Sequence, residues 1–348
     1  MAPLTRMRAT NPDRAPTALH AEYYAQRATA GLIISEGTFV SPESVGWASV
    51  PGLWSTAQVS GWRLVTDAVH RAGGRIFAQL WHTGSLSHPD FYGGELPPAP
   101  SPVNPGQKSV TPTGKKDTVT PREMSAPEIR DTVRAFGHAA RSAMEADFDG
   151  VQLQAGYHYL FNQFLHPRTN LRQDAYGGSI ENRARFLFEV LDEVVAVVDR
   201  GRVGVKTGPA TLETGAFVSG DETLSTFEYV IARLNDYELS HLLLMGQMAD
   251  VSATPIAHLG GDGMFRHFRN VYRGSIIANV DIDQARANRL IGEGLVDLVA
   301  FGRPFIANPD LVARFASGAP LAAVDQATVY GATPRGYTDY PPANDEGR

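Results

Sequence analysis

The stretch GVQLQAGYHYL at residues 150–160 places polar and aromatic side chains directly after a short apolar run. The run is expected to be a buried strand, and Gln154, Tyr157 and Tyr159 stand at or just beyond its end. An amide donates N–H groups, and a phenol donates an O–H group and can transfer a proton. These residue types suit a site that works by hydrogen bonding and proton transfer.

Comparable side chains follow the other expected strands. They are Thr5 and Arg6, residues 36–38, residues 79–83, Lys206, residues 245–247, residues 279–281, and Gly302 with Arg303. The set is rich in amide, hydroxyl and cationic donors. His82 and His88 are its only close His pair and are better interpreted as loop residues than as metal ligands. No Ser-His-Asp arrangement is present either, so a bound organic cofactor is expected to carry the chemistry and no metal is expected.

The elements that must position these residues alternate along the chain. Short β-branched runs alternate with longer amphipathic segments, which is typical of parallel strands covered by helices. Strands are expected at 32–35, 76–80, 151–154, 203–206, 241–244, 275–278 and 298–301, with residues 1–4 as a short eighth candidate. Helices are expected at 56–72, 125–146, 181–199 and 281–292. Ser125 and Glu128 form the pattern of a capping box at the start of the second of these helices.

This pattern predicts an α/β protein with one domain over residues 1–348, built as a (β/α)8 TIM barrel. A doubly wound dinucleotide-binding sheet is the weaker alternative, because no G-x-G-x-x-G follows an early strand. The Pro- and Gly-rich segment 93–121, inserted after the third strand, is too long for an ordinary connection. It is expected to cap the site, with a disordered insertion as the alternative.

Composition narrows the class of protein. The chain has 348 residues, 43% of them apolar, and a formal net charge of −6 from 31 Lys and Arg against 37 Asp and Glu. No basic run indicates a nucleic-acid partner, and no apolar run approaches the roughly 18 residues that would span a membrane. No signal-peptide pattern is present, so a cytoplasmic location is the expectation. The absence of Cys excludes disulfides, thiolate nucleophiles and Cys-bound metals.

Six segments resemble the Old Yellow Enzyme family of FMN-dependent reductases. They are MAPLTRMRA at 1–9, AEYYAQRATAGLIISEGT at 21–38, AQLWHTG at 78–84, NQFLHPRTNLRQDAYGGSIENRARF at 162–186, VAFGRPFIANPDL at 299–311 and GYTDYP at 336–341. They occur in the family's order and span almost the whole chain. The resemblance implies a barrel with FMN across its mouth, reduced by NADPH or NADH and reoxidised by a small-molecule acceptor such as an activated alkene, a quinone or a nitro compound. A monomer or a homodimer would fit.

The resemblance also assigns roles to residues. Thr5 would bond the flavin O4, while the Gly37 backbone and the Gln79 amide would bind the pyrimidine edge. Gly302 and Arg303 would hold the phosphate. Tyr159 would protonate the substrate. Further residues that the resemblance implies are Pro3, beside the cofactor, and Trp81, Thr83 and Tyr330, on the substrate side.

Three departures from the family pattern bear on the mechanism. Gln154 and Tyr157 replace the usual substrate-polarising pair, which reads His and then His or Asn. Lys206 stands where the family usually has Arg, so a compact ammonium replaces a forked guanidinium. Asn279 and Val280 lie in a phosphate turn that is usually richer in Gly.

A further departure concerns the chain start, because relatives carry a short N-terminal hairpin ahead of MAPLTR and here it is truncated or missing. The alternative to an enzyme is a catalytically degenerate barrel that binds FMN or another small ligand without turnover.

Overall fold

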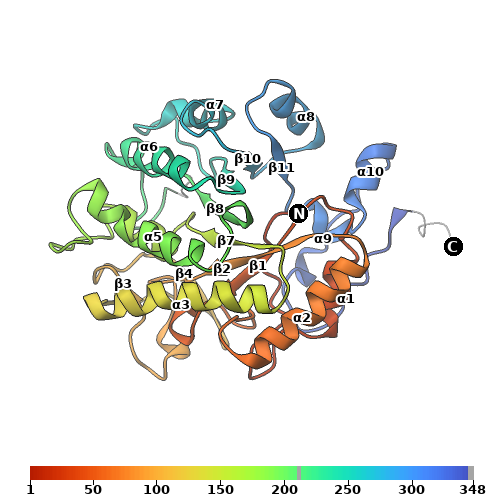
Figure 1. The fold of residues 1–348 in the computed structure, drawn as a ribbon, viewed down its shortest axis with the longest axis horizontal. Helices are drawn as coiled ribbons and strands as arrows, with labels where there is room; N and C mark the ends of the chain where they lie inside the picture. Colours follow the sequence, from red (N-terminus) through yellow and green to blue (C-terminus); the bar gives the residue numbers. More distant parts are fainter. Residues whose placement is uncertain (210–212, 344–348) are drawn as a thin grey trace.

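The computed structural model describes residues 1–209 and 213–343. Seven strands form one parallel sheet in which strands that follow each other along the chain lie side by side (Figure 1). In sheet order they are β1 (Ile33–Phe39), β2 (Ile76–Trp81), β7 (Gly150–Gln154), β8 (Val203–Thr207), β9 (His241–Met245), β10 (Ile276–Asn279) and β11 (Leu298–Ala300). Each coincides with one of the expected runs, so the prediction of these strands is confirmed.

The helices lie around the outside of the sheet, and most of them connect successive strands (Figure 1). They are α1 (Ala18–Ala25), α2 (Thr56–Arg71), α3 (Ala126–Glu145), α4 (Leu160–Leu165), α5 (Ile180–Val195), α6 (Thr223–Leu234), α7 (Gly263–Arg269), α8 (Gln284–Gly292), α9 (Pro304–Ala307) and α10 (Leu311–Ser317). The expected capping box is present, because the backbone N–H of Ser125 donates to the Glu128 carboxylate at 2.7 Å. No helix within the described residues is long and apolar enough to cross a membrane.

The N-terminal residues link the two edge strands of the sheet. The N–H of Ile34 in β1 donates to the carbonyl of Met1 at 3.1 Å, and the N–H of Ala2 donates to the carbonyl of Phe301, just after β11, at 2.8 Å. Residues 1–4 therefore occupy the eighth position around the sheet, although they form no regular strand. All carboxyl ends of the strands point to one rim, where a barrel of this type carries its reactive groups.

Strands β1, β2, β7, β8, β9 and β10 consist of buried residues because both faces of the sheet are covered there, whereas Leu298 of β11 is about half exposed. Side chains such as Trp62 of α2 and Phe136 of α3 are fully buried in one continuous apolar core with the strand residues. A smaller cluster of Phe39, Val45, Val50 and Trp81 lies at the rim. Phe39 and Trp81 are the last residues of β1 and β2, and their rings stack with centroids 5.0 Å apart, which packs the two strand ends together.

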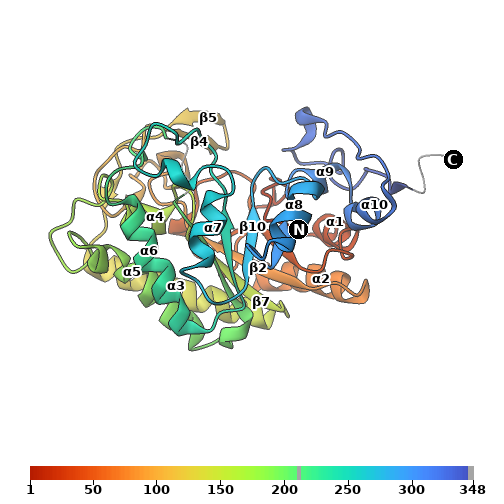
Figure 2. The same ribbon diagram turned by 90° about the horizontal axis from the view of Figure 1, so that it is seen from above.

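The segment 93–121 contains short strands: β3 (Pro98–Ala99) and, as a hairpin, β4 (Lys108–Thr111) and β5 (Gly114–Asp117), followed by β6 (Arg122–Glu123). Figure 2 shows the hairpin at one edge of the molecule, away from helices α3 and α5. It packs on the loop after β1, where the N–H of Ala48 donates to the carbonyl of Val110 at 2.9 Å. Residues 108–117 of the segment therefore form an ordered hairpin beside the rim.

Candidate active site

A cavity of about 310 Å³ lies at the carboxyl ends of the strands. We call it the first cavity. Its lining residues are Pro3, Thr5, Gly37, Trp47, Gln79, Trp81, Leu86, Gln107, Lys108, Gln154, Tyr157, Tyr159, Lys206, Met245 and Met248. Nine of these were named as site residues from the sequence, and they come from five separate segments of the chain. Parallel strand order brings them together, because each follows or ends a strand at the same rim.

Several polar groups that line this cavity have no hydrogen-bond partner among the described residues. Within the described residues, no hydrogen bond engages the hydroxyls of Thr5, Tyr157 and Tyr159 or the ammonium of Lys206, and the buried Oε1 of Gln154 has no partner. Buried polar groups in folded proteins nearly always have partners. An unpartnered set that faces one cavity therefore indicates a ligand site whose ligand supplies the missing partners.

Tyr159 and Tyr157 are held as neutral hydrogen-bond donors. The ring of Tyr159 packs edge-on against Trp81, with centroids 4.8 Å apart, and the ring of Tyr157 lies 5.2 Å from that of Tyr159. Burial raises the pKa of both phenols above the ordinary value. Each phenol therefore keeps its proton at neutral pH and can donate it to a hydrogen bond.

Lys206 provides a positive charge at the end of β8. Its side chain is almost fully buried, and no ion pair engages it within the described residues. Burial lowers the pKa of Lys206 to about 8, because a charged ammonium loses hydration there. The group still carries its proton for most of the time at pH 7 and can stabilise a developing negative charge in the cavity.

Gln79 is fixed by a row of polar groups beneath the cavity. Its Nε2 donates to Oε1 of Gln152 at 2.7 Å, and the Gln152 amide in turn contacts Nε2 of His241 at 2.8 Å. Gly37 pairs with Gln79 across β1 and β2, after an irregularity in the register. A Cβ at Gly37 would lie 2.4 Å from the ring of Trp81, so only glycine lets the strand approach this closely.

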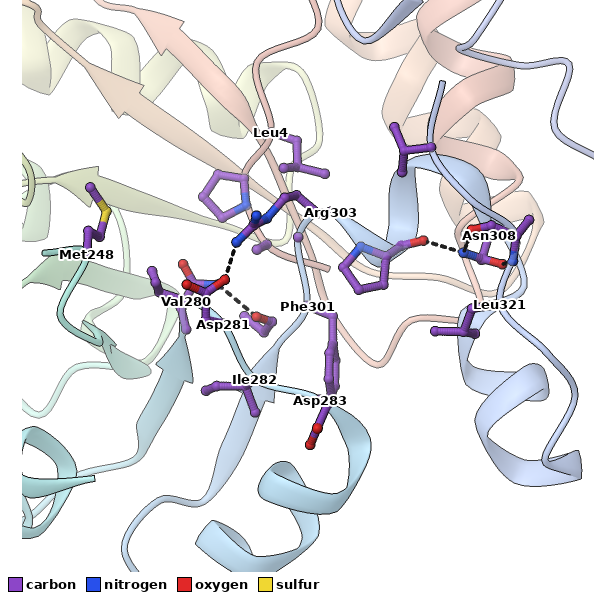
Figure 3. Close-up of a pocket in the computed structure, with 18 residues that line it drawn as sticks. Leu4, Met248, Val280, Asp281, Ile282, Asp283, Phe301, Arg303, Asn308 and Leu321 are labelled. Carbon is purple, nitrogen blue, oxygen red and sulfur yellow. Dashed lines mark hydrogen bonds and ion pairs between the residues drawn. The ribbon is translucent and has the colours of Figure 1, made fainter. Parts of the chain in front are cut away.

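A second cavity of about 790 Å³ adjoins the first, since Pro3 and Met248 line both. Figure 3 shows Arg303 pointing toward Asp281 across this cavity, and the two side chains form an ion pair. Both are mostly exposed. Asn279, Val280 and Gly302, which were assigned to the phosphate from the sequence, also line this cavity.

The turn after β10 in this cavity is strained. Val280 has φ +82° and Asp281 has φ +49°, a left-handed conformation that is rare for a β-branched residue. Successive backbone N–H groups in a tight turn can form a concave anion-binding shape. The ring-sized first cavity and the anion-binding second cavity together fit an elongated aromatic ligand with a phosphate, which is the form of FMN.

Two predicted substrate residues lie elsewhere. Thr83 is fully buried, and its hydroxyl donates to the carbonyl of Ser44 at 2.9 Å, so it lies behind the cavity wall. Tyr330 is half-exposed and lines a third cavity on the outer side of Trp47. Sequence reasoning missed Trp47, Leu86, Met248, Gln107 and Lys108; the last two lie in the segment expected to cap the site.

Comparison with known proteins identifies the family. The family model of the NADH:flavin oxidoreductase / NADH oxidase family matches residues 1–322. The chain is 39% identical over 347 residues to 12-oxophytodienoate reductase 1 of Oryza sativa subsp. japonica, covering 98% of this chain and 88% of that protein.

Two solved structures that resemble this chain indicate the same family. Morphinone reductase in complex with tetrahydroNAD has a TM-score of 0.90 at 40% identity, covering 100% of this chain and 94% of that chain. The old yellow enzyme homologue from Zymomonas mobilis also has a TM-score of 0.90, at 39% identity, covering 98% and 94%. The chain thus belongs to the NADH:flavin oxidoreductase / NADH oxidase family and is an FMN- and NAD(P)H-dependent oxidoreductase of the Old Yellow Enzyme type, with a TIM barrel fold.

Proposed function

We propose that this enzyme reduces electron-poor acceptors and that Gln154 and Tyr157 bias it toward quinones and nitro compounds over simple enones. When bound, FMN accepts a hydride from NAD(P)H and delivers it to the acceptor. The protein's own residues decide how the flavin is held and how the acceptor is polarised and protonated.

The two adjoining cavities suggest how FMN is held. Thr5, Gly37, Gln79 and Lys206 would surround the ring in the first cavity, with the Lys206 charge favouring a negatively charged reduced ring. The second cavity would hold the phosphate. The residues we assign to it are Asn279, Val280, Gly302 and Arg303, and Pro3 lines both cavities.

Tyr159 is the proton donor in this proposal. Its phenol lines the first cavity with no hydrogen-bond partner among the described residues, and burial raises its pKa. For an alkene acceptor, the hydride would add to one carbon and the Tyr159 proton to the other, and solvent would restore the phenol proton.

The observation that carries the acceptor preference is the neutrality of Gln154 and Tyr157. Gln154 cannot ionise, and Tyr157 stays protonated because burial raises its pKa. Neutral donors stabilise an enolate oxygen less than a charge-assisted donor such as imidazolium. Quinones and nitro compounds depend less on this help, because they are intrinsically stronger electron acceptors.

Tyr157 also restricts the cavity. It has φ +59°, and its ring stacks on His158 with centroids 4.6 Å apart. Asparagine, the residue that the family has at this position in some members, adopts a left-handed conformation more readily than tyrosine. The ring therefore stands in the cavity at some conformational cost, which is consistent with a role in selecting the acceptor.

The test compares acceptors in the natural protein and in the Gln154→His, Tyr157→Asn double variant. We expect slow reoxidation of the reduced enzyme by cyclohexenone and fast reoxidation by a quinone. The double variant should raise the cyclohexenone rate on the order of a hundredfold, the typical effect of one oxyanion donor, with little change for the quinone. Gln173→His, on the exposed surface, is the matched control.

Rapid cyclohexenone reduction by the natural protein would refute the proposed preference. So would a double variant that keeps its FMN but leaves a slow cyclohexenone rate unchanged. A flavin that no acceptor reoxidises in either protein would instead support the degenerate, ligand-binding alternative.

A further inference from the structure

A third cavity, of about 710 Å³, opens beside the first and has no part in the function proposed above. We call it the outer cavity. Its lining residues are Met7, Ala9, Thr10, Asn11, Pro12, Arg14, Trp47, Ala48, Ser49, Val110, Thr111, Pro112, Gly114, Lys115 and Tyr330. Trp47 lines both the outer cavity and the first cavity, so one indole separates them.

The charge of the outer cavity is entirely positive. Among residues 1–209 and 213–343, Arg14 and Lys115 are its only charged lining residues, and no Asp or Glu lines it. Nearby lysines on the same hairpin are paired: Lys108 with Asp117 at 2.5 Å and Lys116 with Asp90 at 2.6 Å. Within the described residues no carboxylate pairs with Lys115. Its ammonium is available to an anion.

Arg14 is partly buried in the wall. One of its nitrogens lies 3.4 Å from the carbonyls of both Trp47 and Val50, which are long contacts for hydrogen bonds. Burial lowers its pKa, so the guanidinium has lost hydration without gaining a carboxylate. An anionic ligand would supply that missing partner.

The same cavity offers aromatic surface. The rings of Trp47 and Tyr330 have centroids 6.1 Å apart at 55°, and half of Tyr330 is exposed to solvent. A purine base can stack on such a ring, and stacking of a base on an aromatic side chain is worth about 1–3 kcal/mol. Cations and exposed aromatic rings together match a ligand that carries both a phosphate and a base.

The position of the cavity identifies that ligand. A nicotinamide ring that reacts with the flavin must enter the first cavity, and the rest of the coenzyme must leave it. The second cavity is assigned to the phosphate of FMN, whereas the outer cavity lies across Trp47 and has no assigned ligand. We infer that the outer cavity binds the phosphorylated adenosine half of the nicotinamide coenzyme, an inference that rests on the proposed function.

Calorimetric titration of the FMN-loaded protein with adenosine 2′,5′-bisphosphate and, separately, with ADP tests the inference. Neither probe contains nicotinamide, so binding is measured without electron transfer. We expect at least one to bind, and Lys115→Ala to weaken that binding about tenfold, as for loss of one charge-assisted hydrogen bond. Lys116→Ala is the matched control, since Asp90 already engages that lysine. Tyr330→Ala should also weaken binding, through loss of stacking.

The two probes identify the phosphate that is bound. Tighter binding of the 2′,5′-bisphosphate would assign the site to the 2′-phosphate and predict a preference for NADPH, whereas tighter binding of ADP would assign it to the pyrophosphate. Absence of binding by both probes would overturn the inference, as would equal effects of Lys115→Ala and Lys116→Ala. Failure of the acceptor preference would leave these titrations unaffected, so the two proposals fail separately.

Discussion

At the scale of single residues, Asp281 is the least expected feature of the site. Its carboxylate pairs with Arg303, the cation assigned to the FMN phosphate, and both side chains are mostly exposed. An exposed ion pair contributes little to stability. Its presence matters more for the ligand, because a phosphate must compete with a carboxylate of the same sign for one guanidinium.

We therefore predict that Asp281→Asn tightens FMN binding by about threefold, while Arg303→Ala weakens it by roughly tenfold or more. Quenching of free FMN fluorescence on titration with apoprotein measures both changes. Asp131→Asn, which removes an exposed partner of Arg134 on α3, is the control. Weaker binding by Asp281→Asn would mean that Asp281 orients Arg303, and the competition argument would be wrong.

At the scale of elements, the regular parts of the fold could be predicted from sequence and the irregular parts could not. The strands of the sheet are compact apolar runs, such as Val203–Thr207 and His241–Met245, and each is bounded by turn residues. Local pattern alone indicates them. The hairpin of Lys108–Thr111 and Gly114–Asp117 has no such apolar pattern. It is held in place by tertiary packing on residues 46–48, which a local sequence pattern does not reveal.

The same distinction applies to the site. Residues at or near strand ends, such as Gln79, Gln154 and Lys206, line one cavity, as parallel strand order leads one to expect, and their roles toward a ligand stay predictions. Thr83 was expected at the substrate but faces Ser44 instead, because the direction of a side chain beyond the strand depends on the loop that it meets. The outer cavity was missed, since the segments that form it are distant in sequence.

At the scale of the whole molecule, the C-terminal segment is clamped onto the N-terminal one. Nε of Arg6 donates to the carbonyl of Val329 at 2.9 Å, and Nη2 of Arg8 donates to that of Thr328 at 2.9 Å. The ring of Tyr337 stacks on Tyr23, with centroids 3.9 Å apart at 7°. These contacts, which we call the clamp, hold the segment that contains Tyr330. The shape of the outer cavity therefore depends on them.

Tyr337 allows the packing of this clamp to be separated from its polarity. The residue is fully buried, and its hydroxyl has no hydrogen-bond partner in the part of the chain that the structure describes. We predict that Tyr337→Ala lowers the free energy of unfolding by about 3–5 kcal/mol, the usual cost of deleting a large buried ring. Tyr337→Phe should be neutral or stabilising by about 1 kcal/mol, because it removes an unpartnered buried hydroxyl. Urea unfolding followed by circular dichroism measures both; equal losses would contradict the prediction.

The central claim, that the two rim cavities hold an FMN reduced by a nicotinamide coenzyme, is tested most directly by the visible spectrum of the purified protein. Under anaerobic conditions the yellow flavin absorption should disappear when NADPH or NADH is added and return when a quinone follows. A protein that binds no added FMN, or a bound flavin that stays oxidised with both coenzymes, would contradict the account.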